Sequence, residues 1–338
     1  MIKDYLKQLI LRKDLSRSQA RELMAIFLDP ATTDAQITAL LVALLLKGET
    51  EEEITGMAEA MHDSFEVLHS SHSKLIDTAG TGGGIETFNV STTVAFVIAG
   101  AGLPVAKHGN YSGIAGTSSA EVLAELGVGI HVDRQLCQRC LEELGIAFLF
   151  APLFHPVMKR VAGIRREIGV RTVFNLLGPI TNPASAHYQI IGVFHEGLTE
   201  VIAKVLRDLG AEKAWVVHGS DGLDEITITG TTRVTEINRK EVRTFYLEPE
   251  EFGLKPGDGT QLAGGDARRN AAILKEILEG RRRDAARDVV LVNAAAGLYV
   301  AGVARDLKEG MERATESLDS SKALKKLNQL IAITGGAP

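Results

Sequence analysis

Hydrophobic positions in the first 68 residues recur with helical spacing, and no strand-like alternation interrupts them. Three hydroxyl residues each stand three positions before a Gln or Glu, as in a capping box, where both side chains satisfy amide groups at a helix N-terminus. The pairs are Ser16 with Gln19, Thr33 with Gln36, and Thr50 with Glu53. Asp29-Pro30 and Gly48 supply stop signals. This segment is therefore predicted to be all-helical.

From about residue 74 the pattern changes to short apolar runs that alternate with helical stretches. Runs at 74–78, 104–107, 147–150, 189–194 and 214–218 predict strands. Strands separated by helices of about ten residues are typical of parallel-sheet crossovers. Residues 226–245 alternate with period two and predict hairpins, and the chain after about residue 263 is helical again.

The predicted fold class is α/β, with a small all-helical N-terminal domain and a larger α/β domain that has a mostly parallel central sheet. A chain of 338 residues suits two domains, at about 150 residues per domain. We expect the helical domain to hold residues 1–70 and part of about 155–185. Residues 71–154 and 186–338 form the α/β domain in this prediction.

Charge and composition exclude several classes of protein. There are 37 Lys and Arg against 43 Asp and Glu, a net charge of −6, which argues against nucleic acid or an anionic membrane as the main partner. The N-terminus lacks signal-peptide features, and the apolar runs are shorter than the roughly 20 residues of a membrane span, so we expect a cytoplasmic protein. The two cysteines, Cys137 and Cys140, are interpreted as helix residues without a catalytic or zinc-binding role.

Glycine is enriched, with 34 residues in the chain. The densest cluster, 80–84, follows a predicted strand and precedes a helix that begins near Ser91. Successive amides without a Cβ can form an anion-binding nest, and a helix N-terminus adds partial positive charge. The cluster matches neither the dinucleotide fingerprint nor the phosphate loop. A phosphate site is one interpretation, and a glycine-rich turn without a ligand is the other.

Three further segments favour the phosphate site. Asn89, Ser91 and Thr92 stand at the start of the predicted helix, where they could bind a ligand or cap the helix. Lys107 ends a predicted strand, where ligands of open parallel sheets gather. Asp224-Glu225 follows another strand, and Mg²⁺ often uses two carboxylates together with phosphate oxygens. Taken singly, each could instead be a solvated surface feature.

Together these motifs resemble those of the anthranilate phosphoribosyltransferase family, in order, over almost the whole chain. The matching segments are 80–83, 87–92, 107–110, 171–179, 218–219 and 221–225. The resemblance implies transfer of phosphoribose from phosphoribosyl pyrophosphate to the amine of anthranilate, in tryptophan biosynthesis. It also implies a fold similar to that of pyrimidine nucleoside phosphorylases, and a homodimer formed through the helical domain.

The resemblance further implies roles for individual residues, with no strong acid or base among them. Phosphoribosyl pyrophosphate would contact Gly80, Gly83, Gly84, Thr87, Asn89, Ser91, Thr92, Lys107 and Ser119. Anthranilate would contact Gly80, His108, Asn110, Arg165 and Gly178. Ser91, Asp224 and Glu225 would bind Mg²⁺.

Two loops depart from the family pattern. Gly84-Ile85-Glu86 replaces a longer loop with an aspartate, and residues 111–116 lack two basic groups and two hydroxyls. Charge-assisted hydrogen bonds contribute about 1.5 to 3 kcal/mol each, so these changes predict weaker pyrophosphate binding. The alternative is a paralogue that uses another aromatic acceptor, or a non-catalytic protein that binds a ligand or nucleic acid. A nucleic-acid surface would draw on Arg268, Arg269 and residues 281–283.

Overall fold

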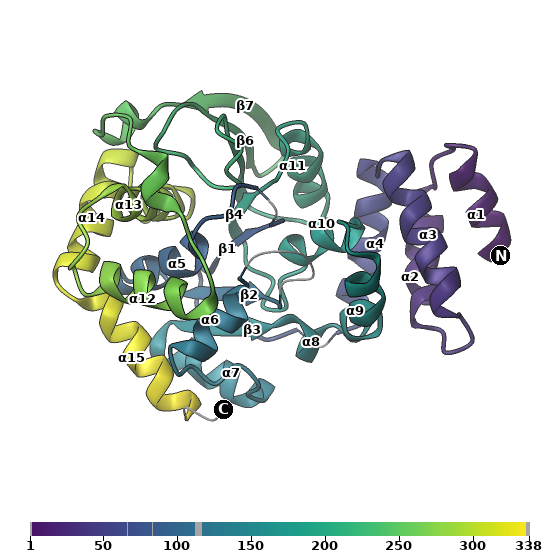
Figure 1. The fold of residues 1–338 in the computed structure, drawn as a ribbon, viewed down its shortest axis with the longest axis horizontal. Helices are drawn as coiled ribbons and strands as arrows, with labels where there is room; N and C mark the ends of the chain where they lie inside the picture. The colour runs from purple at the N-terminus through teal and green to yellow at the C-terminus, as the bar shows by residue number, and fades with distance from the viewer. Residues whose placement is uncertain (1, 66, 83, 112–116, 336–338) are drawn as a thin grey trace.

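A computed structural model of the chain describes residues 2–65, 67–82, 84–111 and 117–335 (Figure 1). Four N-terminal helices form one end of the molecule, and a seven-stranded sheet with its covering helices forms the remainder. This arrangement confirms the predicted fold class.

The N-terminal helices begin where the capping boxes predict. They are α1 (Ile2–Ile10), α2 (Arg17–Leu28), α3 (Asp34–Lys47) and α4 (Glu51–Asp63). Both hydrogen bonds of the capping box are present at the start of α2, α3 and α4, and Asp29 and Gly48 are the C-caps of α2 and α3. Helix α4 ends at Asp63, five residues before the predicted end of the helical segment.

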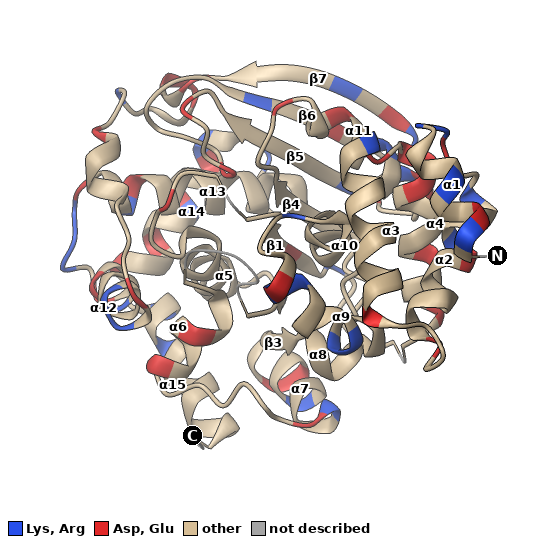
Figure 2. Ribbon diagram, turned by 45° about the vertical axis from the view of Figure 1, so that its right-hand side comes forward, with Lys and Arg blue, Asp and Glu red and all other residues tan. Residues whose placement is uncertain are grey.

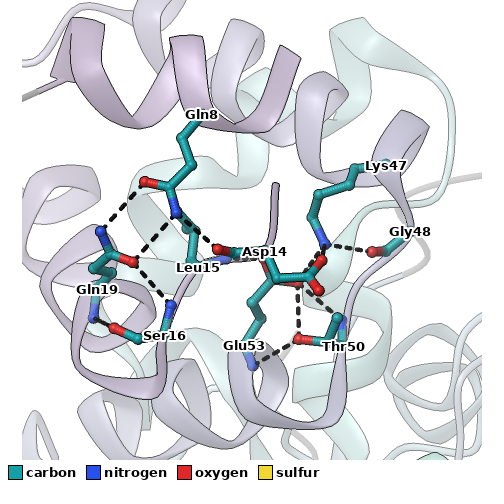
Figure 3. A network of polar contacts seen from close by, with 9 residues as sticks. All are labelled: Gln8, Asp14, Leu15, Ser16, Gln19, Lys47, Gly48, Thr50 and Glu53. Carbon is teal, nitrogen blue, oxygen red and sulfur yellow. Dashed lines mark hydrogen bonds and ion pairs between the residues drawn. The ribbon is translucent and has the colours of Figure 1, made fainter. Parts of the chain in front are cut away.

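A buried ion pair ties these helices together (Figure 3). Glu53 is fully buried, and its carboxylate accepts hydrogen bonds from the Leu15 amide and the Lys47 ammonium, both at 2.8 Å. The same carboxylate also closes the Thr50 capping box. The Lys47 ammonium reaches Asp14 as well, at 2.8 Å. One carboxylate thus joins the start of α4 to the end of α3 and to the α1–α2 connection.

The sheet has the strand order β3-β2-β1-β4-β5-β6-β7. The first five strands in this order are parallel to one another. Strand β6 runs antiparallel to β5, and β7 runs antiparallel to β6. The predicted hairpins at 226–245 are one hairpin, β6–β7, and residues 226–231 belong to no strand. The strands are β1 (Ile76–Gly80), β2 (Val105–Gly109), β3 (Ile146–Phe150), β4 (Tyr188–Gly192), β5 (Lys213–Gly219), β6 (Thr232–Asn238) and β7 (Glu241–Leu247).

Helices cover both faces of the sheet (Figure 1). Helices α5 and α13 pack on one face, against β1 and β4, while α10 and α11 pack on the other, against β2 and β5. The remaining α-helices are α5 (Val90–Gly100), α6 (Ser119–Glu125), α7 (Arg134–Arg139), α8 (Ala151–Phe154), α9 (Pro156–Ile168), α10 (Val173–Ile180), α11 (Leu198–Asp208), α12 (Ala267–Leu278), α13 (Ala285–Val300), α14 (Leu307–Asp319) and α15 (Lys322–Thr334). A π-helix spans Cys140–Leu144, and 3-10 helices span Pro249–Phe252 and Gly259–Leu262.

The sheet separates two hydrophobic cores. One core lies between the sheet and α5, α13 and their neighbours. The other contains residues of α1–α4 together with residues of α9, α10, α11 and the opposite sheet face. Because α9 and α10 share the second core with α1–α4, the central residues 155–185 are anchored to the helical end.

Both cysteines lie in the predicted helical stretch and are buried. Burial raises the pKa of Cys137 to about 12 and that of Cys140 to about 11. Thiols with such pKa values are poor nucleophiles at neutral pH.

Charges of both signs are interspersed over α1, α4 and α11 (Figure 2). The arginines considered for a nucleic-acid surface are largely neutralised, because Arg281, Arg282 and Arg283 pair with Glu279, Asp284 and Asp319. None of the helices in the described residues has the length and apolar character of a membrane span.

The ion pair of Figure 3 leads to a stability prediction. Replacing Lys47 with Met leaves the Glu53 carboxylate buried without its cation, and should lower the free energy of unfolding by about 3 to 5 kcal/mol. Lys322→Met is the matched control, since Lys322 and its partner Glu316 are exposed and should contribute less than about 1 kcal/mol. Urea unfolding measures both variants, and equal losses would contradict the prediction.

Candidate functional site

A cavity of about 310 Å³ opens at the carboxyl ends of β1 and β2. From β1 the chain proceeds outward to β2 and β3, then returns to β4 on the other side of β1. Ligands of open parallel sheets bind at such a point of reversal. The cavity is bounded on its other side by α9 and α10, so it lies where the helical end meets the sheet.

Most residues singled out from the sequence line this one cavity. They are Gly80, Gly84, Thr87, Asn89, Ser91, Lys107, His108, Asn110, Ser119, Arg165, Gly178, Asp224 and Glu225. Thr92 does not: it is buried beside Phe96 and Phe148, behind the cavity wall, and its hydroxyl has no partner among the described residues. Gly83 lies outside the described residues, as does the loop 112–116.

The glycine-rich segment packs closely on the segment that carries the two acids. A Cβ on Gly80 would lie 2.9 Å from the Asp224 carboxylate, and one on Gly84 would lie 2.7 Å from the Gly222 carbonyl oxygen. The Gly82 amide donates a hydrogen bond to Asp224 at 3.0 Å. At Gly80 and Gly84 another part of the chain, and not a ligand as the sequence predicts, approaches the glycine backbone.

Two adjacent carboxylates are buried at the cavity wall. Burial and the charge of the neighbouring Asp224 together raise the pKa of Glu225 to about 8, against the pull of Lys107. Burial also raises the pKa of Asp224. A bound divalent cation would compensate both charges, so these groups fit a metal that takes its other ligands from substrate and water. Within the described ranges no cluster of three or more His, Cys, Asp or Glu side chains forms a closed metal site.

Lys107 is the buried cation of the site. It is 4 % exposed, and its ammonium donates to the Thr78 carbonyl. Burial lowers its pKa, while the charges of Asp77 and Glu225 act in the opposite direction. Asp77 is fully buried; burial raises its pKa to about 6 against the pull of Lys107. Lys107 therefore balances a carboxylate of the sheet and a carboxylate of the cavity.

Helix α5 presents its N-terminus to the cavity, as the sequence predicts. Asn89 is its N-cap residue, but the Asn89 side chain does not cap the helix. Instead, that side chain donates to the Thr117 carbonyl at 2.9 Å and accepts from Asn270 at 3.0 Å. In the first turn of α5 the Val90 amide donates to the Phe88 carbonyl oxygen at 2.7 Å, and the Ser91 amide donates to the Glu225 carboxylate, so the positive end of this helix meets the acidic pair.

Arg165 lies across the cavity on α9. Its guanidinium donates to the Asn175 side chain at 3.3 Å and lies 5.8 Å from the Phe174 ring centroid. Burial lowers its pKa to about 10, and no carboxylate of the described residues pairs with it. A desolvated guanidinium without a counter-ion favours binding of a carboxylate ligand.

His108 joins β2 to α10. Its Nδ1 donates to the Gly178 carbonyl oxygen at 2.9 Å, and its ring lies 5.1 Å from that of the fully buried His155. Burial lowers the pKa of His108 to about 4, and the pKa of His155 is lowered for the same reason. His108 is therefore a neutral donor that binds the last turn of α10 through the Gly178 carbonyl oxygen.

Sequence reasoning missed several residues of the site. Asn175 links Arg165 to the Thr172 amide, and Arg171 lines the cavity with its guanidinium 4.5 Å from the Phe194 ring centroid. Arg171 and Asn175 lie in a segment quoted for its resemblance, but their spacing alone carries no signal of function. Asp77, inside a strand, could have been suspected only as a charge in an apolar run.

Comparison with known proteins identifies relatives of the whole chain. Residues 72–324 match the α/β domain of a glycosyl transferase family, and residues 3–65 match its helical bundle domain. The anthranilate phosphoribosyltransferase of Pelotomaculum thermopropionicum is 50 % identical over 336 residues, covering 99 % of this chain and 97 % of the relative. That of Anaeromyxobacter dehalogenans is 49 % identical, covering 99 % of both chains.

Solved structures agree in fold. The anthranilate phosphoribosyltransferase of Thermus thermophilus superposes with a TM-score of 0.89 at 40 % identity, over 98 % of this chain and 99 % of that one. The Saccharomyces cerevisiae enzyme in complex with phosphoribosyl pyrophosphate and Mg also has a TM-score of 0.89, at 30 % identity, over 99 % of this chain and 98 % of that one.

The buried histidine predicts a loss of stability in acid. The pKa of His108 is about 4 in the folded protein against 6.5 as a free side chain, so between these values only the unfolded chain binds the proton. Lowering the pH from about 6.5 to about 4 should therefore reduce the free energy of unfolding of the wild type by about 3 kcal/mol through this group. The variant His108→Gln should not show that part of the loss. Urea unfolding at several pH values measures this difference. His195→Gln, at an exposed imidazole, should follow the wild type; parallel curves for His108→Gln and the wild type would refute the assignment.

Proposed function

The chain belongs to the anthranilate phosphoribosyltransferase family, and we propose that it moves phosphoribose from phosphoribosyl pyrophosphate to the amine of anthranilate. One observation carries the proposal. A buried carboxylate pair and a glycine-rich loop line one side of the cavity, and a desolvated arginine without a carboxylate partner among the described residues lines the other. The carboxylate pair and the loop suit a metal-bound diphosphate, and the arginine suits an aromatic acid.

The donor substrate would lie on the β1 side of the cavity. The positive end of α5 and the Lys107 ammonium supply positive charge for its phosphates. The other groups assigned to it are Gly80, Gly84, Thr87, Asn89, Ser91 and Ser119, all on the cavity wall. Gly83 and Thr92 remain part of the proposal by resemblance alone.

Mg²⁺ would be held by Asp224, Glu225 and Ser91. Bound there, it would neutralise part of the charge that develops on the departing pyrophosphate. The Saccharomyces cerevisiae relative has been solved with phosphoribosyl pyrophosphate and Mg, which supports this assignment.

The acceptor would lie on the α9–α10 side. Arg165 would hold the anthranilate carboxylate, with Asn110, Gly80, His108 and Gly178 around it. Asn175 keeps the guanidinium in place before substrate arrives, which reduces the entropy lost on binding. The structure of the Saccharomyces cerevisiae relative with 4-fluoroanthranilate supports an acceptor of this kind.

The reaction breaks the bond between ribose C1 and the pyrophosphate oxygen and forms a bond between C1 and the anthranilate nitrogen. The electron pair of the broken bond leaves with pyrophosphate, and the amine loses one proton. Because the ribose centre becomes cationic as the bond lengthens, the protein contributes chiefly by stabilising the leaving group and orienting the amine. None of the residues proposed here acts as a strong general base.

The helical end would also form a homodimer. Ile10, Leu11 and Leu46 are exposed by 66 %, 67 % and 71 %, and they belong to α1, the residue after it and α3, which pack on each other. Exposed apolar side chains grouped in this way mark a contact surface.

The function is tested by the loss of anthranilate fluorescence in the presence of phosphoribosyl pyrophosphate and Mg²⁺. Asp224→Asn should lower kcat/KM by at least about 100-fold, because a buried ligand charge is lost. Arg165→Lys should raise the KM for anthranilate by about 10- to 100-fold and leave that for phosphoribosyl pyrophosphate unchanged. Arg166→Lys, at the exposed neighbour on α9, is the control. No turnover by the wild type would sink the proposal.

The dimer is tested separately by sedimentation velocity. Leu46→Glu places a charge in the apolar contact and should convert a dimeric wild type into a monomer. Leu153→Glu, at a leucine that is 51 % exposed on α8, should leave the dimer intact. A monomeric wild type would contradict the assignment.

A further inference from the structure

One side chain contacts both walls of the proposed active site. Asn175, the third residue of α10, lines the cavity together with Thr81 of the glycine-rich segment and Arg165 of α9. Asn175 is half-buried, and Thr81 is 4 % exposed. The proposed function places the diphosphate on the side of Thr81 and the carboxylate of the acceptor at Arg165. Asn175 therefore contacts one group on the donor side and one on the acceptor side.

The amide of Asn175 has a single orientation that satisfies its neighbours. Its Oδ1 accepts from the Thr172 backbone amide at 3.1 Å and from the Arg165 guanidinium at 3.3 Å. Both of these partners can only donate, so the oxygen must face them. Its Nδ2 donates to the Thr81 carbonyl oxygen at 3.5 Å, and a carbonyl oxygen can only accept. Each end of the side chain is thus used toward a different wall.

The contact with Thr81 leads directly to the acidic pair. The Thr81 carbonyl belongs to the same peptide unit as the Gly82 amide, which donates to the Asp224 carboxylate at 3.0 Å. A peptide unit is planar, so its carbonyl and its amide cannot reorient independently. The Thr81 amide also donates to the Gly192 carbonyl oxygen at 2.9 Å, which holds this segment to the end of β4. A ligand that fixes Asp224 therefore also fixes the carbonyl group that faces Asn175.

We propose that Asn175 is a positioning residue that couples binding of the donor to binding of the acceptor. This role rests on the proposed function, since Asp224 stands for the metal diphosphate and Arg165 for the acceptor. The 3.5 Å contact with Thr81 is long for a hydrogen bond, so ordering of the peptide unit by a ligand can strengthen it. A metal diphosphate at Asp224 then fixes Asn175 and the Arg165 guanidinium, and the acceptor loses less entropy when it binds.

Two substitutions of Asn175 separate this bridge from simple support of Arg165. Alanine removes the contacts with Thr81, Thr172 and Arg165 together. Aspartate keeps an oxygen for Thr172 and Arg165, but it has no donor and places a second oxygen against the Thr81 carbonyl. Its charge also competes with the acceptor carboxylate for Arg165, so the affinity for anthranilate falls in this variant. The coupling is a ratio of two affinities of one variant and does not depend on that loss.

The experiment measures the Kd of anthranilate by calorimetry of the full chain with Mg²⁺, with and without saturating inorganic pyrophosphate, which carries no ribose to transfer. Pyrophosphate should tighten anthranilate binding to the wild type by at least about threefold, and anthranilate should tighten pyrophosphate binding by the same factor. In Asn175→Ala and Asn175→Asp both factors should fall to about 1. Asn328→Ala, at an exposed asparagine of α15, is the matched control and should keep the factor of the wild type.

A purely structural role of Asn175 gives a different result. Asn175→Ala would then weaken anthranilate binding equally with and without pyrophosphate, and the coupling factor would stay that of the wild type. That outcome, or a factor of about 1 in the wild type, would overturn the inference, and turnover of anthranilate would leave the proposed function intact. A wild type that does not bind anthranilate would refute both. Asn175→Asp keeps the acceptor of the Thr172 amide and should unfold at nearly the temperature of the wild type.

Discussion

The buried ammonium of Lys107 is the interaction on which the active site depends. It stands in the middle of β2, two residues before the strand ends at Gly109, and lies between the Asp77 carboxylate within the sheet and the Glu225 carboxylate at the cavity wall. Two buried carboxylates without a nearby cation would be costly in a sheet covered on both faces. With Lys107 in place, the sheet can support an acidic pair beside an anion-binding loop, so one cavity can accommodate both a metal and phosphate.

The two hydrophobic cores explain why the acceptor side belongs to different elements from the donor side. The glycine loop, α5 and Lys107 are supported by the sheet and the core under α5 and α13. Arg165 and Gly178 belong to α9 and α10, which share the core of the helical end. The cavity between them has one wall from each unit.

Local sequence signals predicted the elements well and the long-range contacts poorly. Each capping box is complete within four residues, so its pattern is visible in the chain, and the motifs at strand ends meet because parallel strands end at one edge. The support of Arg165 by Asn175 and of Asp77 by Asn182 depends on how α10 and the turn after it lie against the sheet. Thr92 shows the same limit: it is one residue from Ser91, yet helix geometry turns it behind the wall.

Gly192, at the end of β4, touches no substrate in the proposed reaction. A Cβ there would nevertheless lie 1.6 Å from the Asp224 carbonyl oxygen, so the acidic segment can dock only on a bare backbone. The position of the Asp224–Glu225 pair thus depends on contact between its own segment and the end of β4, which meet only in the folded protein. Metal affinity would then report whether this contact has formed. Substitutions in either segment would be constrained by the other, even at residues that do not touch the ligand.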